Sequence, residues 1–373
     1  MIKVLFNTNA IRSRNTGIGK YTLALRDSLQ KVAADQVTIM SDGAIENINS
    51  HQETSKNSTL MGLVRDHVPF AYTARRFLEQ RQFDKLVNGS DPDLYHEPTL
   101  WPLSFSGPTV ITVHDLSHLR FPETQPKNRL KEINKRFDNA MDQAASILVD
   151  SHFIQQELLS HYPSIANKLK VAPLGCSQSL HQPNQRLLAA LLSQYQLVEN
   201  SYFIFVGTLE PRKRLPLAIA SHQALPKAMR KLFPLLVIGD KGWLNHDQHA
   251  ELDEFIVLTG YLGDNELSQL MQGARAMLFT SIYEGFGLPV LESMVAGTPC
   301  ILSPDIASAE IASETALYAS GSDPDEWVKA LKHAIEAPDI IAKLAEQAKN
   351  RAKEYTWERC AELTLNAYQD AIS

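Results

Sequence analysis

The sequence predicts an α/β protein built from two similar domains, and three observations lead to that class. Its 373 residues are more than one hydrophobic core of ordinary size accommodates. Short apolar runs alternate with helical segments along the chain, which is typical of parallel strands joined by crossover helices. Prolines, glycines and serines gather between residues 173 and 183, as they do in linkers. We therefore expect one domain over residues 1–178 and another over residues 179–355.

Each half contains a series of short apolar runs that we predict as strands. In the first half these runs are Lys3–Phe6, Gln36–Met40, Leu94–His96, Val110–Val113 and Ser146–Val149. In the second half they are Tyr202–Val206, Leu235–Ile238, Phe255–Leu258, Ala276–Thr280 and Pro299–Leu302. The polar residues 41–60 interrupt the first half, and we predict a mobile excursion there.

Helices are predicted between the strands from periodic apolar positions and from residues that start or stop a helix. Tyr21–Lys31 and Leu215–His222 are two such helical runs. Another helix should begin near Pro289, because proline fits the first helical position, where its missing N–H costs nothing. Gly297 and Pro299 should end that helix.

The composition describes a globular protein and excludes several classes. Hydrophobic residues make up 44% and charged residues 21% of the chain. No apolar run approaches the roughly 18 residues that a membrane span needs. The opening segment, Met1–Phe6, is too short for a signal peptide, so we expect a cytoplasmic protein. Cys176, Cys300 and Cys360 lie far apart without metal-ligand spacing, which predicts reduced thiols and neither a zinc site nor a disulfide framework.

Charge is distributed unevenly between the two halves. The net charge is −6, but residues 1–180 carry +2 and residues 181–373 carry −8. The positive side chains of the first half form two clusters, Arg75, Arg76, Arg81 and Lys85, and then Lys127, Arg129, Lys131, Lys135 and Arg136. Two interpretations stay open: an ordinary solvated helix face, or a surface that attracts anionic lipid at the inner face of the cell membrane. The acidic balance and the lack of an aromatic stacking pattern argue against nucleic acid as a partner.

The most informative segment is Glu284-Gly-Phe-Gly-Leu-Pro-Val-Leu-Glu292, which joins two carboxylates through a glycine-rich turn. Because a predicted strand precedes it, Glu284 should lie in a strand-to-helix loop and Glu292 in the first turn of the helix. Open α/β sheets bind ligands at the carboxyl ends of their strands, and the N–H groups of a helix start point there too. A carboxylate accepts from two adjacent hydroxyls, which suits a sugar or a ribose. The competing interpretation is a solvated glutamate and a helix cap.

A pair of cations follows the predicted strand Tyr202–Val206. Arg212 and Lys213 stand directly before the helical run Leu215–His222. An arginine fork binds two phosphate oxygens and a lysine acts as a point charge, so the pair suits a departing diphosphate. Cations at a helix start oppose the helix dipole, which makes a merely solvated charge run less favourable.

Two further motifs lie where predicted strands end. Gly17 and Gly19 precede the helical run Tyr21–Lys31, so their backbone can approach a phosphate or a sugar closely. His114 ends the strand Val110–Val113. A plain glycine turn and a structural histidine are the competing interpretations. His118 follows four residues later, but no carboxylate ligand stands at a fitting spacing, so we predict no metal site.

Taken together, these motifs resemble those of the retaining GT-B glycosyltransferases, in the large family that includes bacterial phosphatidylinositol and O-antigen mannosyltransferases. Glu-x7-Glu is the signature of that family. The resemblance covers the whole chain in order, from Gly17-Ile-Gly19 through Thr112-Val-His-Asp-Leu116 and Val206-Gly-Thr-Leu-Glu-Pro-Arg-Lys213 to the segment at Trp357. It implies two Rossmann-like domains with parallel sheets facing across a cleft, and a last helix over residues 356–373 that crosses back to the first domain.

The resemblance also implies a role for each motif residue. Glu284 would bind hydroxyls of the donor sugar, Glu292 the ribose of the nucleotide, and His114 the sugar near its reacting carbon. Arg212 and Lys213 would stabilise the diphosphate, and how they share this task stays open because many relatives carry an arginine where this chain has Thr208. The remaining expected contacts come from the flexible first loop, from main-chain N–H groups and from a base-binding turn: Gly17, Gly19, Phe286, Gly287, Leu288, Tyr261 and Leu262.

We therefore expect a retaining, metal-independent hexosyltransferase without a cofactor. The expected reaction moves mannose from GDP-mannose to a lipid-linked or oligosaccharide acceptor in the synthesis of a surface polysaccharide. UDP-sugars and dTDP-rhamnose stay open as donors, because few residues select base or sugar openly. Nucleotide-sugar 2-epimerases share the fold, but they should need further acid–base residues around the sugar ring. A degenerate partner subunit is a third alternative, and the filled charged motif positions argue against it.

Overall fold

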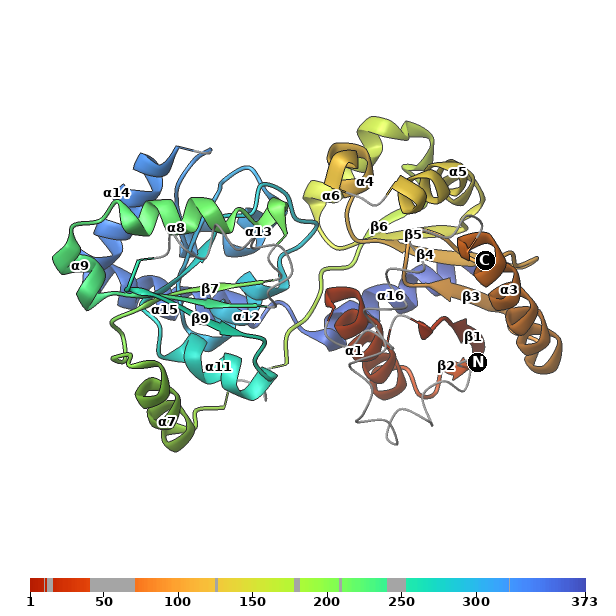
Figure 1. Cartoon of the computed structure of the whole chain (residues 1–373). Helices are drawn as coiled ribbons and strands as arrows, with labels where there is room; N and C mark the ends of the chain where they lie inside the picture. Colours follow the sequence, from red (N-terminus) through yellow and green to blue (C-terminus); the bar gives the residue numbers. More distant parts are fainter. Residues whose placement is uncertain are drawn as a thin grey trace. The chain divides into compact units, whose positions relative to one another are not determined.

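The computed structural model describes residues 1–9, 11, 16–40, 71–124, 127–177, 182–207, 210–239, 253–321 and 323–373 (Figure 1). The chain divides into two compact units, Met1–Leu174 with Trp357–Ser373, and Gly175–Thr356. The excursion expected at residues 41–60 lies outside the described residues, and so do Thr208 and the side chain of Arg75. None of the described helices is long and apolar enough to cross a membrane.

The first unit contains a six-stranded parallel sheet with the strand order β2-β1-β3-β4-β5-β6. Its strands are β1 (Ile2–Phe6), β2 (Val37–Met40), β3 (Leu94–Glu97), β4 (Thr109–Val113), β5 (Ser146–Val149) and β6 (Leu169–Val171). The predicted apolar runs form the first five of these. The edge strand β6 was not predicted, because its three residues do not form a buried apolar run.

Helices cover both faces of this sheet. They are α1 (Gly17–Val32), α3 (Ala71–Ser90), α4 (Ser117–Arg120), α5 (Lys127–Gln143), α6 (His152–His161) and α16 (Trp357–Ile372). Phe83 of α3 packs against Tyr95 of β3. The next residue of β3, His96, bonds Tyr368 of α16 at 2.6 Å. Because successive residues of a strand point to opposite faces, α3 and α16 lie on opposite sides of the sheet, and α1 packs beside α16 (Figure 1).

The second unit contains another six-stranded parallel sheet, with the order β12-β11-β10-β7-β8-β9. Its strands are β7 (Phe203–Val206), β8 (Leu235–Ile238), β9 (Ile256–Gly260), β10 (Ala276–Phe279), β11 (Cys300–Leu302) and β12 (Leu317–Tyr318). The prediction of parallel α/β sheets is thus confirmed. The two-residue edge strand β12 was not predicted, because it is only partly buried.

The helices of the second unit enclose its sheet around a core of aromatic and branched side chains. They are α7 (Gln185–Tyr195), α8 (Leu215–Gln223), α9 (Lys227–Leu232), α11 (Asp264–Gln272), α12 (Leu288–Ala296), α13 (Ala307–Ala312), α14 (Pro324–Glu336) and α15 (Pro338–Ala352). Trp327 of α14 is fully buried and packs in one cluster with Phe203 and Phe205 of β7. This core fixes β7 and β10 side by side, in the register Phe203 to Ala276.

Two helix starts follow the sequence signals, with one correction. Helix α12 carries proline in its first turn, as predicted, and ends at Gly297, whose φ of 81° suits glycine. Helix α1 begins at Gly17, four residues before the predicted run. The Thr16 side chain caps it by accepting the Gly19 N–H at 3.1 Å. Gly17 and Gly19 therefore belong to a helical turn and not to a preceding loop.

Candidate functional site

Three charged side chains meet where β7 and β10 end. The Lys213 ammonium lies 2.7 Å from Glu284 Oε1, and an Arg212 guanidinium nitrogen lies 2.9 Å from Glu284 Oε2. Each carboxylate oxygen thus receives its own cation. Lys213 and Glu284 are buried, with 8% of each exposed. We call Arg212, Lys213 and Glu284 the cation–carboxylate cluster.

The backbone around this cluster is tied by hydrogen bonds between the two loops. The Ile282 N–H donates to the Arg212 carbonyl at 3.0 Å, and Thr280 Oγ1 donates to the Lys213 carbonyl at 2.7 Å. The Arg212 guanidinium in turn donates a hydrogen bond to the Tyr283 carbonyl at 2.7 Å. These bonds hold the segment Pro211–Lys213, a turn of 3-10 helix, against the loop that carries Glu284.

The electrostatics of the cluster favour an ionised glutamate. Burial alone would raise the pKa of Glu284, but Lys213 and Arg212 outweigh it and lower the pKa below its ordinary value. The Lys213 ammonium also lies over the Phe279 ring, 5.4 Å from its centroid. A second carboxylate, that of the partly exposed Glu210, lies 3.4 Å from the Arg212 guanidinium, so the formal charges of these four side chains balance. The two cations are nevertheless fixed in place by the protein, and such preorganised donors suit an anion.

Glycines let the strand ends approach each other beneath the lysine. A side chain at Gly239 would lie 1.9 Å from the Gly207 carbonyl oxygen, so only glycine fits where β7 and β8 end. Gly207 has a φ of 153°, and the aliphatic stem of Lys213 passes 3.6 Å from where its Cβ would stand. Gly239 was not predicted as part of the site. The run Ile238-Gly239 at the end of a predicted strand was the available signal.

The turn before α12 requires glycine on two grounds. Gly287 has a φ of 100°, and a Cβ there would lie 2.0 Å from the Ser308 hydroxyl, which donates to the Phe286 carbonyl at 2.8 Å. The Phe286 side chain is buried against Tyr355, so only its main chain can serve the predicted role. The Leu288 N–H has no partner within α12, whereas the Val290 and Leu291 N–H groups donate to the Gly287 carbonyl at 2.9 and 3.3 Å. Glu292 is the fifth residue of α12, and the first turn holds no acidic residue, so its predicted place there was wrong.

The predicted base-binding turn follows the end of β9. Gly260 ends that strand with a φ of 77°, and Tyr261 and Leu262 come directly after it. Tyr261 is 59% exposed, which makes it one of the exposed large hydrophobic side chains of the described residues. An exposed aromatic at the carboxyl end of a parallel strand can stack on a planar base.

His114 of the first unit lies at the end of β4 with both ring nitrogens engaged. Nδ1 lies 2.7 Å from Asp150 Oδ2, and Nε2 lies 3.2 Å from the Pro98 carbonyl oxygen. The ring packs edge-on against Tyr21, with 4.6 Å between the centroids. Asp150 was missed, although it follows the strand Ser146–Val149 just as His114 follows the neighbouring strand. Gly17 and Gly19 lie in this same unit, whereas all other predicted site residues lie in the second unit.

The two basic clusters of the first unit differ in structure. In the first cluster, Arg76 donates to the carbonyls of Trp101 and Pro102, and Arg81 lies over the Phe77 ring. Arg76 therefore anchors a loop. In the second cluster, on α5, Arg136 pairs with Glu132 at 3.3 Å. The remaining members, Lys127, Arg129, Lys131 and Lys135, are exposed.

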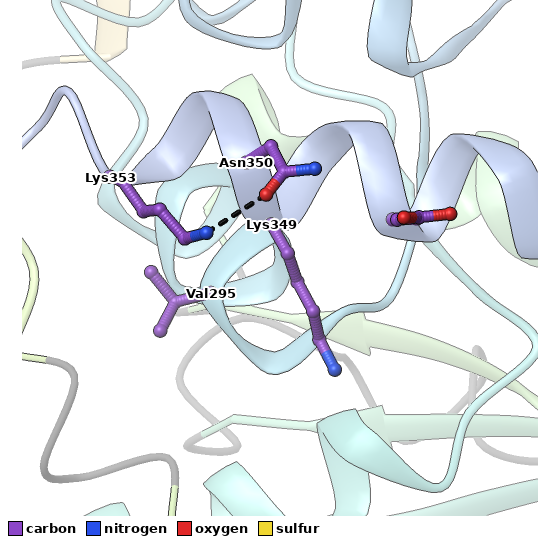
Figure 2. Close-up of a pocket in the computed structure, with 5 residues that line it drawn as sticks. Val295, Lys349, Asn350 and Lys353 are labelled. Atoms are coloured by element: carbon purple, nitrogen blue, oxygen red, sulfur yellow. Dashed lines mark hydrogen bonds between the residues drawn. The ribbon is translucent and has the colours of Figure 1, made fainter.

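The described residues contain no group of three or more histidines, cysteines, aspartates or glutamates that could hold a metal ion. His118 is buried against the Phe137 ring, with 4.6 Å between centroids. A surface pocket lies between α12 and α15, lined by Val295, Glu346, Lys349, Asn350 and Lys353 (Figure 2). It contains none of the predicted site residues, and the Lys353 ammonium donates to the side-chain oxygen Oδ1 of Asn350 within it. We assign it no function.

Comparison with known families now identifies the class of protein. Residues 193–355 match the family described as glycosyl transferases group 1, and residues 15–180 match glycosyltransferase family 4. The chain belongs to these glycosyltransferases and is an enzyme of the GT-B type, as its motifs predicted.

Individual relatives and solved structures are similar to the chain over most of its length. The chain is 28% identical over 381 residues to O-antigen chain mannosyltransferase B of Escherichia coli, covering 99% of this chain and 100% of the relative. It is 23% identical to the O-antigen chain mannosyltransferase RfbU of Salmonella typhimurium, covering 91% and 93%. Among solved structures, sucrose-phosphate synthase from Thermosynechococcus elongatus matches with a TM-score of 0.73 and 16% identity over 99% and 98% of the two chains. The glycosyltransferase WaaG matches with a TM-score of 0.69 and 14% identity over 98% of each chain. These structural matches support the fold.

Proposed function

We propose that this glycosyltransferase transfers mannose from GDP-mannose, with retention of configuration and without a metal ion, to a lipid-linked or oligosaccharide acceptor in O-antigen synthesis. The similarity that spans the whole of an O-antigen mannosyltransferase supports the sugar and the pathway. The cation–carboxylate cluster is the observation that carries the chemistry. In this proposal the second unit binds the nucleotide-sugar and the first unit serves the acceptor.

The cluster supports a metal-free departure of the diphosphate. Its two cations follow the carboxyl end of β7 and meet Glu284 beyond the end of β10, and α12 begins four residues after Glu284. Cations and helix N–H groups fixed before the reaction stabilise developing negative charge without reorganising. The leaving phosphate would then help to deprotonate the acceptor on the same face of the sugar, which retains the configuration. Glu284 would hold the sugar hydroxyls, and Glu292 would hold the ribose.

A transfer assay with several donors tests the sugar and the base. Purified protein is incubated with a polyprenyl-diphosphate-linked acceptor and radiolabelled GDP-mannose, UDP-glucose or dTDP-rhamnose. We expect extension of the acceptor with GDP-mannose alone, and NMR of the product should show the α-anomer of the donor. Transfer from another donor alone would show that GDP-mannose is not the donor. Epimerisation of the free nucleotide-sugar in the absence of acceptor would instead support a nucleotide-sugar 2-epimerase.

Metal dependence is tested separately. Activity should persist in excess EDTA, because Arg212, Lys213 and helix N–H groups neutralise the diphosphate. The control is a metal-dependent transferase assayed in the same EDTA buffer, which must lose its activity. Complete loss of mannosyl transfer that manganese alone restores would contradict the metal-independent account.

A further inference from the structure

The register of the first sheet places the carboxylate of Asp150 against the His114 ring. Strands β4 and β5 are parallel neighbours, with Val113 opposite Val149. The next residues, His114 and Asp150, therefore leave the sheet side by side. Their side chains meet at 2.7 Å between Nδ1 and Oδ2. Asp150 is 2% exposed, so the carboxylate has been taken out of water to make this contact.

The partners of the ring favour a proton on each of its two nitrogens. Nδ1 faces a carboxylate oxygen, and Nε2 faces the Pro98 carbonyl at 3.2 Å. A backbone carbonyl only accepts a hydrogen bond, and an ionised carboxylate does too. The Tyr21 ring fixes the orientation by packing edge-on at an interplanar angle of 82°. The imidazole is thus held as a donor on both sides.

The environment of Asp150 leads to the same protonation state. Its second oxygen, Oδ1, is buried and has no hydrogen-bond partner within the described part of the chain. A buried carboxylate with so few partners is costly unless a positive charge stands beside it. Burial alone would lower the pKa of His114, but Asp150 and then Asp115 outweigh it and raise the pKa above its ordinary value. Further titratable groups near this pair are His96 of β3, Tyr21 of α1 and Cys360 of α16. Burial and then the charge of His114 lower the pKa of His96, whereas burial and then Asp150 raise the pKa of Cys360.

We propose that Asp150 is a positioning residue that keeps His114 oriented and doubly protonated, so that its Nε2–H donates to an oxygen of the donor sugar. The proposal rests on the proposed function, together with the contact to the donor sugar that the family resemblance implies for His114. In the structure the Nε2–H points at the Pro98 carbonyl. A sugar hydroxyl that replaces this carbonyl would accept a charge-assisted hydrogen bond, which is stronger than a neutral one.

The first test follows His114 itself, independently of activity. Histidine-selective labelling and NMR give the titration of each ring, and the His114→Gln variant identifies the signal of His114. In the parent protein we expect His114 to titrate above 6.5, the ordinary value. In Asp150→Asn the amide can still accept from Nδ1–H but carries no charge, so the pKa of His114 should fall. A titration at or below 6.5 in the parent protein overturns the proposal without any variant.

The second test is the pH profile of sugar transfer. In Asp150→Asn, kcat should fall about tenfold or more, and the alkaline limb of the profile should move to lower pH, while KM for the donor changes little. Asp142→Asn removes an exposed carboxylate from α5 of the same unit and should leave both the profile and the His114 titration unchanged. A shifted titration with an unshifted profile overturns the positioning role. A shifted titration in a protein that transfers no sugar supports the pairing and rejects the proposed function instead.

Discussion

At the residue scale, Lys213 is the side chain on which the leaving-group chemistry depends most directly. Lys213→Ala should lower turnover by about a hundredfold or more, because one fixed cation for the departing diphosphate is removed. Turnover is measured with saturating GDP-mannose, and circular dichroism confirms folding. Lys227→Ala removes an exposed lysine of the same unit and should have no effect. Near-normal turnover of Lys213→Ala would locate the leaving group elsewhere.

Alanine variants of the two signature glutamates, Glu284 and Glu292, should lose different steps of the reaction. Glu284→Ala removes the proposed sugar contact, so turnover should fall while free GDP binds nearly as before. Glu292→Ala should weaken the binding of GDP itself, because it removes the proposed ribose contact. Calorimetry with GDP on both variants makes the comparison. Equal loss of GDP affinity in the two variants would contradict these roles.

Residue types and strand ends allowed the charged cluster to be predicted, but not its internal contacts. Arg212 and Glu284 were both placed after apolar strands, and the structure has both there. Their direct pairing depends on β10 lying next to β7, and strand order is not visible in the apolar pattern. Gly17 and Gly19 were read as a loop, because glycine also serves in the capped first turn of a helix, here below Thr16. Asp150 could have been predicted in the same way as His114, because each residue directly follows a predicted strand.

At the scale of single elements, α5 tests whether the basic surface of the first unit has a partner. Changing Arg129, Lys131, Lys135 and Arg136 together to glutamine should reduce sedimentation with anionic liposomes at low salt and leave donor affinity unchanged. These residues lie on one amphipathic helix whose Ile133 and Phe137 are buried. The control changes four exposed lysines of the second unit to glutamine, Lys227, Lys231, Lys329 and Lys343.

The outcomes separate the two interpretations of that helix. Salt-sensitive association that only the α5 variant loses supports a membrane-facing surface. If the parent protein does not associate, or if high salt leaves association unchanged, these side chains form an ordinary solvated face. Arg76 was left out of the test because its bonds to Trp101 and Pro102 give it a structural task.

Element prediction succeeded where burial produces a clear apolar run. The central strands β4, β5, β7 and β8 are buried along most or all of their length, and each was predicted within one or two residues. The edge strands β6 and β12 are short and partly exposed, so their residues carry no such run. Pairing with a neighbour creates these strands, and the local sequence does not specify it.

At the scale of the whole molecule, a buried polar chain ties the last helix to the sheet of the first unit. His96 Nδ1 bonds the Tyr368 hydroxyl of α16 at 2.6 Å, and Nε2 bonds the Thr112 hydroxyl at 3.0 Å. The Tyr21 hydroxyl of α1 lies 2.8 Å from that same hydroxyl. This chain of hydrogen-bonded side chains thus joins residues from both ends of the sequence. The stability of these hydrogen bonds depends on His96 staying neutral, because all four side chains are buried.

This arrangement predicts how the stability of the first unit depends on pH. Burial, with a smaller contribution from His114, lowers the pKa of His96 from 6.5 to about 3. As the pH falls below 6.5, the unfolded chain binds a proton at this residue and the folded chain does not, which favours unfolding. The contribution of His96 is therefore complete above that pH and is lost at about 1.4 kcal/mol per pH unit as the pH falls toward 3.

Urea unfolding of the parent protein and of His96→Asn, at several pH values between about 7.5 and about 5, measures how the free energy of unfolding depends on His96. These limits span the range in which an ordinary histidine titrates. The variant should be less stable at the upper limit, because it loses bonds to Tyr368 and Thr112. Its free energy of unfolding should then fall less steeply with acid than that of the parent protein. His118, whose pKa burial lowers to about 4, acts in the same direction in both proteins and cancels in the comparison. Parallel slopes would mean that His96 takes up its proton in the folded chain, and that the buried polar chain does not depend on a neutral imidazole.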